Sequence, residues 1–237
     1  MTSTAVEPAG GGWEDYLEIF YAPSKVFARR GSRWGGPLLV LVIVTAIVVL
    51  GTKGLLGSLL QQDNARVMAE KMKTMTPEQV AQVQKFGNKT GEFLPYFIIV
   101  FTAILPFILG IFYWLVGKVV GATQELGAAF MVATFSYFPR ILAGALTGLQ
   151  AAVLPEEKLT GMASISYSPA RFLDPAHTSL GVMALAARFD IFILWTTVLL
   201  AIGLKVTGKV TTDKAVIAGV IMFLLGSLPA LFQMLRS

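Results

Sequence analysis

Long runs of apolar residues, separated by short polar segments, dominate this chain. Five runs occupy residues 37–60, 93–120, 126–153, 180–206 and 215–235. A helix crosses the hydrocarbon core of a bilayer with about 20 predominantly apolar residues, and each run reaches that length. The pattern predicts an all-α, polytopic membrane protein with five transmembrane helices.

The segment before the first run has a different pattern. Between Trp13 and Arg30, apolar residues recur at helical spacing, charged residues separate them, and Pro23 interrupts the series. This predicts an N-terminal amphipathic helix in the headgroup region; a helix packed under the transmembrane helices is the alternative. We expect Trp13, Arg33 and Trp34 to act as interfacial anchors, residues 1–12 to form a disordered tail and residues 13–237 to form one domain.

The polar segment between the first two runs also carries helical spacing. Two short amphipathic helices on or near the outer membrane surface are predicted for residues 61–91. The sequence Thr76-Pro77-Glu78-Gln79 is typical of a helix start, because Gln79 is placed to close a capping box with Thr76.

Two opposite charges fall inside apolar runs. Arg140 lies near the middle of the third run, and Asp190 lies about ten residues into the fourth. A charged side chain in the bilayer core is costly and needs a partner or water. Antiparallel helices would bring the two residues to similar depths, so we expect an intramembrane pair of Arg140 and Asp190. The pair is either structural or part of a polar path.

Glycines four residues apart occur in two of the runs. Gly117 with Gly121 and Gly144 with Gly148 are candidate helix-packing pairs, because glycine lets helix backbones approach closely. Packing inside the protein is the first interpretation, and self-association into a homo-oligomer is the second.

Composition and charge narrow the functional class of the protein further. Hydrophobic residues make up 55% of the chain and charged residues only 14%. The Lys and Arg residues cluster at the ends of the apolar runs, which argues against nucleic-acid binding and favours contact with membrane lipid. Their distribution predicts a cytoplasmic N-terminus and, after five spans, a C-terminus on the opposite side.

The chain carries no recognisable catalytic set. It contains no cysteine, one histidine (His177, in a polar loop), no zinc-binding His-Glu-x-x-His, no Gly-x-Ser-x-Gly and no phosphate-binding glycine loop. We therefore expect no enzyme activity and assign no catalytic, cofactor-binding or metal-binding residue.

Several short sequences resemble bacterial members of the Yip family, the Ypt/Rab-interacting proteins. They are Pro23-Ser24-Lys25-Val26-Phe27 ahead of Trp34 and Pro37, Phe135-Ser136-Tyr137-Phe138-Pro139, Asp190-Ile191-Phe192-Ile193-Leu194-Trp195, Ala201-Ile202-Gly203-Leu204 and Lys214-Ala215. The resemblance implies a Yip-like five-helix domain in the bacterial inner membrane. The chain departs from the Asp-Leu-Tyr-Gly-Pro signature of eukaryotic relatives, so Rab binding is not carried over.

Two functions follow as hypotheses. Some bacterial relatives are encoded beside ABC exporters, so the resemblance implies a non-catalytic accessory or scaffold protein whose partner is an ABC exporter permease or adaptor. The alternative is a small transporter or lipid-handling protein that uses Arg140 and Asp190. The odd number of spans, with no visible inverted repeat, argues against the alternative.

Overall fold

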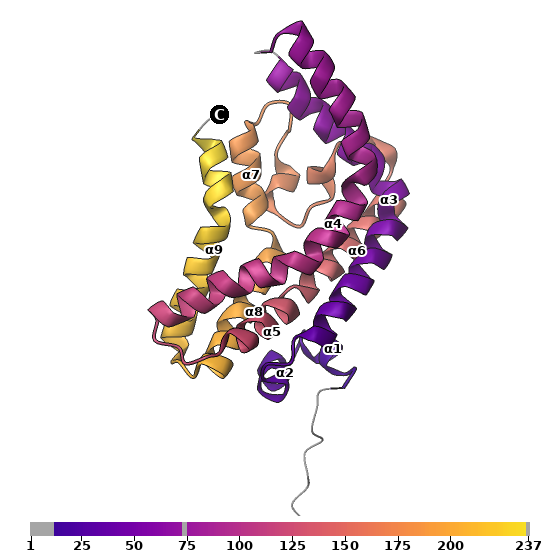
Figure 1. Cartoon of the computed structure of the whole chain (residues 1–237). Helices are drawn as coiled ribbons and strands as arrows, with labels where there is room; N and C mark the ends of the chain where they lie inside the picture. Colours follow the sequence, from indigo (N-terminus) through magenta and orange to yellow (C-terminus); the bar gives the residue numbers. More distant parts are fainter. Residues whose placement is uncertain (1–11, 73–74, 236–237) are drawn as a thin grey trace, which may run out of the picture. The chain divides into compact units, whose positions relative to one another are not determined.

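The computed structural model describes residues 12–72 and 75–235, so the predicted tail at residues 1–12 lies almost entirely outside the described residues. These parts contain helices and no strand. The α-helices, labelled in Figure 1, are α1 (Asp15–Glu18), α2 (Pro23–Arg30), α3 (Gly35–Met72), α4 (Pro77–Val119), α5 (Leu126–Ser136), α6 (Phe138–Val153), α7 (Leu180–Arg188), α8 (Ile191–Gly208) and α9 (Thr212–Met234).

Five helical segments are long and apolar enough to cross a membrane, which confirms the predicted fold class. They are Gly35–Ala69, Phe93–Val119, Leu126–Val153, Ile191–Gly208 and Thr212–Met234. The third combines α5 and α6, which meet at Tyr137, two residues before Pro139. Proline lacks the N–H that would continue the helical ladder, so a break at this point is expected.

One predicted span boundary is wrong. The fourth span begins at Ile191 rather than at residue 180, because residues 180–188 form the separate helix α7. Asp190 therefore lies directly before α8 and not ten residues inside a continuous helix. Asp is favoured at helix starts, where a carboxylate can accept backbone N–H groups, and the predicted depth of Asp190 no longer holds.

The segment between the first two spans also differs from the prediction. Residues 61–72 continue α3, and residues 77–92 are the first part of α4, so no separate short helices form there. Residues 61–72 contain neither proline nor glycine, and nothing in them stops the helix. The predicted start at Thr76 is confirmed: the Thr76 N–H donates to the Gln79 side chain at 3.0 Å, and the Gln79 N–H donates to the Thr76 hydroxyl at 3.4 Å.

The described chain divides into two compact units, and the divisions fall within α3, α4, α6, α8 and α9. Unit 1 comprises residues 12–41, Ala103–Arg140 and Phe192–Leu228. Unit 2 comprises residues 42–72, 75–102, Ile141–Ile191 and 229–235. The single domain expected for residues 13–237 stays a prediction.

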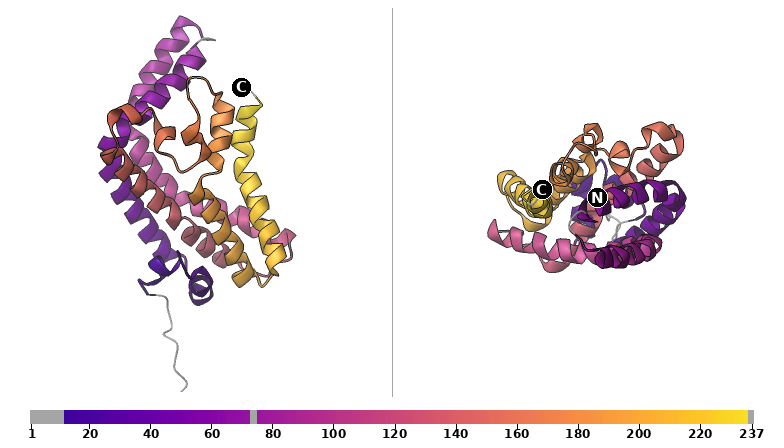
Figure 2. Two further views of the ribbon diagram at one scale, coloured as in Figure 1. Left: turned by 180° about the vertical axis from the view of Figure 1, so that it is seen from behind. Right: turned by 90° about the horizontal axis from the view of Figure 1, so that it is seen from above.

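Unit 2 contains the close approach of α3 and α6, which Figure 2 shows side by side. A Cβ added at Gly148 would overlap the Thr52 methyl group and lie 3.1 Å from its Cβ. After α6, three short 3-10 helices lead to α7, and Ile165 from this loop packs with Leu59 and Ala151 in a buried apolar cluster.

Unit 1 contains most of the large buried side chains. Phe27, Tyr113, Met131, Phe135 and Leu204 are all buried there. Its helices are α1, α2, α5 and α8 with parts of α3, α4, α6 and α9. The candidate functional site lies entirely within this unit.

Candidate functional site: a polar pocket and a buried charge cluster

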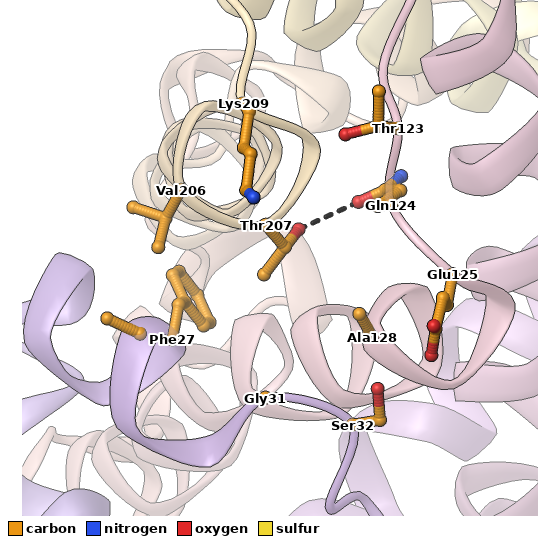
Figure 3. Close-up of a pocket in the computed structure, with 11 residues that line it drawn as sticks. Phe27, Gly31, Ser32, Thr123, Gln124, Glu125, Ala128, Val206, Thr207 and Lys209 are labelled. Carbon is orange, nitrogen blue, oxygen red and sulfur yellow. Dashed lines mark hydrogen bonds between the residues drawn. The ribbon is translucent and has the colours of Figure 1, made fainter.

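A pocket of about 330 Å³ lies in unit 1, where three chain segments meet. Figure 3 shows its lining residues. They are Phe27, Ala28, Gly31 and Ser32 from the N-terminal segment, Thr123, Gln124, Glu125 and Ala128 from the turn before α5 and from α5 itself, and Val206, Thr207 and Lys209 from the end of α8.

The end of α8 is joined to the turn before α5 by hydrogen bonds. The Gly208 carbonyl accepts the Thr123 N–H at 3.1 Å and the Thr123 hydroxyl at 3.3 Å. Helices leave their last carbonyls without an intrahelical partner, and Thr123 supplies the missing donors here. Lys209, the next residue, has φ +53°, a left-handed conformation that is uncommon for a residue with a side chain.

Gln124 and Thr207 form the polar wall of the pocket. The Thr207 hydroxyl lies 2.8 Å from both the Gln124 side-chain oxygen and the Gly203 carbonyl (Figure 3 draws the first contact), and its one hydrogen can be donated to only one of them. Gln124 is 3% exposed, and its side-chain nitrogen has no hydrogen-bond partner among the described residues. That nitrogen lies against Gly117, where an added Cβ would approach it to 2.8 Å.

A buried tyrosine links α4 to α8 nearby. The Tyr113 hydroxyl donates to the Leu200 carbonyl at 2.9 Å, and Tyr113 is almost fully buried. The two helices pack closely, because a Cβ added at Gly203 would lie 3.2 Å from the Tyr113 hydroxyl and would overlap the Val132 side chain. These polar groups join the helices of unit 1 to one another.

Next to the pocket, Asp15, Glu18, Arg29 and Arg30 form a set of ion pairs that we name the charge cluster. Asp15 is fully buried and pairs with both arginines, while Glu18 pairs with Arg29. Arg29 donates hydrogen bonds to the carboxylates of Glu18 and Asp15, and these bonds, Glu18 first, raise the pKa of Arg29 above its ordinary value. The cluster fixes α1 to α2, which are separated by only four residues.

Aromatic contacts attach this N-terminal segment to the rest of unit 1. The Tyr16 ring lies 5.8 Å from Phe135 and 5.4 Å from Phe138, and Phe20 lies 5.5 Å from Trp195, measured between ring centroids. The Arg30 guanidinium lies 5.6 Å from the Phe135 ring centre. The structure has two short helices here, not the one predicted, and a position in the headgroup layer stays a prediction.

The residues predicted from sequence lie in several places. Arg140 is exposed in unit 1 and Asp190 belongs to unit 2, so their pairing stays a prediction. Of the three expected anchors, Trp13 and Arg33 are exposed. Trp34 instead packs against Phe107, with 5.1 Å between the ring centroids.

The four glycines named from sequence also differ in their surroundings. Gly117 and Gly148 lie at close approaches, and Gly144 has ordinary contact distance to Val48. Gly121 lies beyond the end of α4 with φ +83°, so a turn and not helix packing requires this glycine.

Sequence reasoning missed the charge cluster and the Gln124–Thr207 contact. A signal for the first was present, because two short helices that meet near Pro23 would bring Asp15 and Glu18 toward Arg29 and Arg30. No comparable signal exists for the second, since Gln124 and Thr207 are far apart in the sequence and neither belongs to a motif. Among the described residues, no group of His, Asp or Glu side chains is arranged to hold a metal ion.

Comparison with known proteins gives the family. The Yip1 domain model matches residues 17–232. The chain is similar to the membrane protein YknW of Bacillus subtilis, with 29% identity over 214 residues that cover 86% of this chain and 83% of the relative. No solved structure matches the chain. Because the family model spans nearly all of the sequence, this multi-pass membrane protein belongs to the Yip1 domain family.

Proposed function

We propose that this chain is a non-catalytic accessory or scaffold protein of the bacterial inner membrane, which assists another membrane protein. An ABC-type exporter, through its permease or adaptor, is the partner we favour. The observation that carries the proposal is the use of polar groups in unit 1: Tyr113, Thr123 and Thr207 bond to main-chain or amide oxygens of neighbouring segments. Such groups join helices, and this use of them supports a non-catalytic role.

Exposed small residues on α3 support a role in assembly. A Cβ added at Gly51, Gly54 or Gly57 would meet no atom within 4 Å, whereas Gly148, Gly203 and Gly208 are required by close internal contacts. Glycine weakens a helix interior by about 0.5–1 kcal/mol relative to alanine, and no contact among the described residues offsets that cost at these three positions of α3. A transmembrane helix of a partner could approach the backbone closely there.

The proposed orientation places the N-terminus in the cytoplasm. It follows from the Lys and Arg residues near the ends of the spans, including Lys25, Arg33, Lys118, Lys205 and Lys209. The pocket and the charge cluster would then face the cytoplasmic side of the membrane.

A second candidate function, a small transporter or lipid-handling protein, has one observation in its favour. The third span is interrupted at Tyr137, and α7 is separated from α8 next to Asp190. Broken helices commonly form substrate and ion sites in transporters. Loss of uptake or lipid movement in reconstituted vesicles when Asp190 is changed to Asn would favour this candidate over the first.

Crosslinking tests the accessory function directly. The chain has no cysteine, so Gly54→Cys provides a unique attachment point for a photo-crosslinker on the open face of α3, and Ile217→Cys on the exposed surface of α9 is the matched control. After irradiation of native membranes, we expect Gly54 to join the chain to one defined membrane protein, identified by mass spectrometry, and Ile217 to give mainly lipid adducts. Equal, unspecific products from both positions would contradict the proposal.

A further inference from the structure

The first helical segment has an exposed apolar face. Trp13, Leu17 and Tyr21 are 69%, 56% and 74% exposed, and we name these three residues the exposed stripe. Hydrogen bonds between residues four apart keep the backbone helical around them: the N–H groups of Glu18, Ile19 and Ala22 donate to the carbonyls of Glu14, Asp15 and Glu18. Residues four apart lie on one side of a helix, so the three side chains project together.

The opposite side of the same segment is fixed within unit 1. Asp15 and Ile19 are fully buried, and Tyr16 and Phe20 contact rings of α5, α6 and α8. The segment cannot rotate to bury the exposed stripe without breaking the ion pairs of Asp15 with Arg29 and Arg30. The stripe is therefore held outward by the structure.

The charges around the stripe favour an anionic surface. Asp15 and Glu18 are neutralised by Arg29 and Arg30 within the charge cluster, which leaves Lys25, Arg33 and Glu14 as the exposed charges between residues 13 and 33. Arg33 donates to the Arg29 and Arg30 carbonyls at the end of α2, and its guanidinium has further donors for a lipid phosphate.

The chain also keeps this segment close to the first span. Helix α2 ends at Arg30 and α3 begins at Gly35, so four residues separate them. An extended linker of this length reaches at most about 14 Å. Because the first apolar span starts at Gly35, the segment cannot move far from the membrane surface.

We propose that the exposed stripe inserts into the headgroup layer of an anionic membrane leaflet, where Lys25 and Arg33 contact lipid phosphate groups. Trp and Tyr are suited to this layer, since their rings have an apolar body and a polar edge. This lipid-binding surface goes beyond the proposed accessory function, and it would exist in the absence of any protein partner.

Spin labelling of the full chain tests the proposal. Trp13→Cys, Leu17→Cys and Tyr21→Cys each give one label site, and Glu157→Cys, in an exposed loop, is the control. Each variant is reconstituted alone into vesicles of phosphatidylethanolamine and phosphatidylglycerol, or of phosphatidylcholine only. Collision of the label with oxygen, which concentrates in lipid, is compared with collision with a water-soluble nickel complex.

We expect labels at positions 13, 17 and 21 to collide more with oxygen than with the nickel complex, and the label at position 157 to show the reverse. In phosphatidylglycerol vesicles, Lys25→Gln combined with Arg33→Gln should shift the three labels toward water. Labels that stay in water in both kinds of vesicle would overturn the proposal and point to a protein partner for the stripe. Insertion that is equal in phosphatidylcholine and unaffected by the double substitution would overturn the role of anionic lipid.

Discussion

The Asp15 carboxylate is fully buried and forms an ion pair with Arg30, a residue fifteen positions later in the chain. Arg29 binds the other oxygen of the same carboxylate. A buried carboxylate needs such partners, because removing a charge from water is costly. The pair closes the two N-terminal helices onto each other and orients the exposed stripe and the N-terminal wall of the pocket.

Asp15→Asn should destabilise unit 1 strongly, because Arg30 would lose its carboxylate partner and Arg29 would keep only Glu18. Loss of one member of a buried pair typically costs about 3–5 kcal/mol, and the partial exposure of Arg29 places the expected loss near the lower end, about 3 kcal/mol. The measurement is the thermal unfolding midpoint in detergent. Glu14→Gln, an exposed neighbour, is the control and should leave the midpoint unchanged. Similar midpoints for both variants would show that Asp15 does not fix the segment.

Gly203→Ala should destabilise the contact of α8 with α4 and α5, because the new methyl group would overlap Val132 and approach the Tyr113 hydroxyl to 3.2 Å. Overpacking of this kind costs about 1–3 kcal/mol. Val132→Ala in the same chain should restore part of the loss by making room. Gly54→Ala, where a Cβ meets nothing, should instead stabilise the isolated chain by about 0.5–1 kcal/mol. Equal effects at the two glycines would contradict the described packing.

The loop between α6 and α7 should respond to acid through Asp174. Its carboxylate lies 2.5 Å from the His177 ring nitrogen and accepts the Ala176 N–H at 2.8 Å, and these contacts, His177 first, lower the pKa of Asp174 from its ordinary value of 3.8. A lowered pKa favours the folded loop above pH 3.8, and the benefit is lost as the pH falls through the lower folded value. In His177→Asn, the pKa of Asp174, measured by carboxyl NMR, should rise toward 3.8, and an unchanged pKa would exclude His177 as the cause.

The sequence hypothesis of an Arg140–Asp190 pair has its own test. Arg140→Leu should lower the yield of monodisperse protein more than the double change Arg140→Leu with Asp190→Leu, because the single change leaves Asp190 without its charge partner. Additive losses would mean that the two residues act independently. The position of Asp190 just before α8 makes a separate role at the helix start the competing explanation.

Hydrophobic runs were sufficient to predict the five spans, because a bilayer imposes a length that few other structures share. The capping box at Thr76 was also predictable, since both partners lie within four residues. The fourth span was predicted too long, because α7 is also mainly apolar and composition cannot locate the break at Phe189 and Asp190. The extensions of α3 and α4 were missed because apolar runs mark where a helix meets lipid and not where it ends.

The candidate site was much less predictable. Its pocket combines residues from the N-terminal segment, from the turn before α5 and from the end of α8, and only tertiary structure brings them together. Arg140 lies within an apolar run, which makes its charge conspicuous in the sequence. The buried Asp15 instead lies in a segment whose alternating charges are typical of a solvent-exposed helix face. A charge pattern does not reveal burial when the elements that cover it come from elsewhere in the chain.

The most direct test of the accessory function is the composition of the particle that contains this chain in its native membrane. The chain, tagged and expressed at its natural level, is extracted with a small patch of native lipid and weighed by native mass spectrometry. We predict that most of it is found in a particle heavier than multiples of its own 25.5 kDa and that a second membrane protein accounts for the difference. The account would be contradicted if the chain is found only by itself or with copies of itself. Transport of a solute or lipid by vesicles that contain only this chain, lost when Asp190 is substituted, would then favour the transporter function.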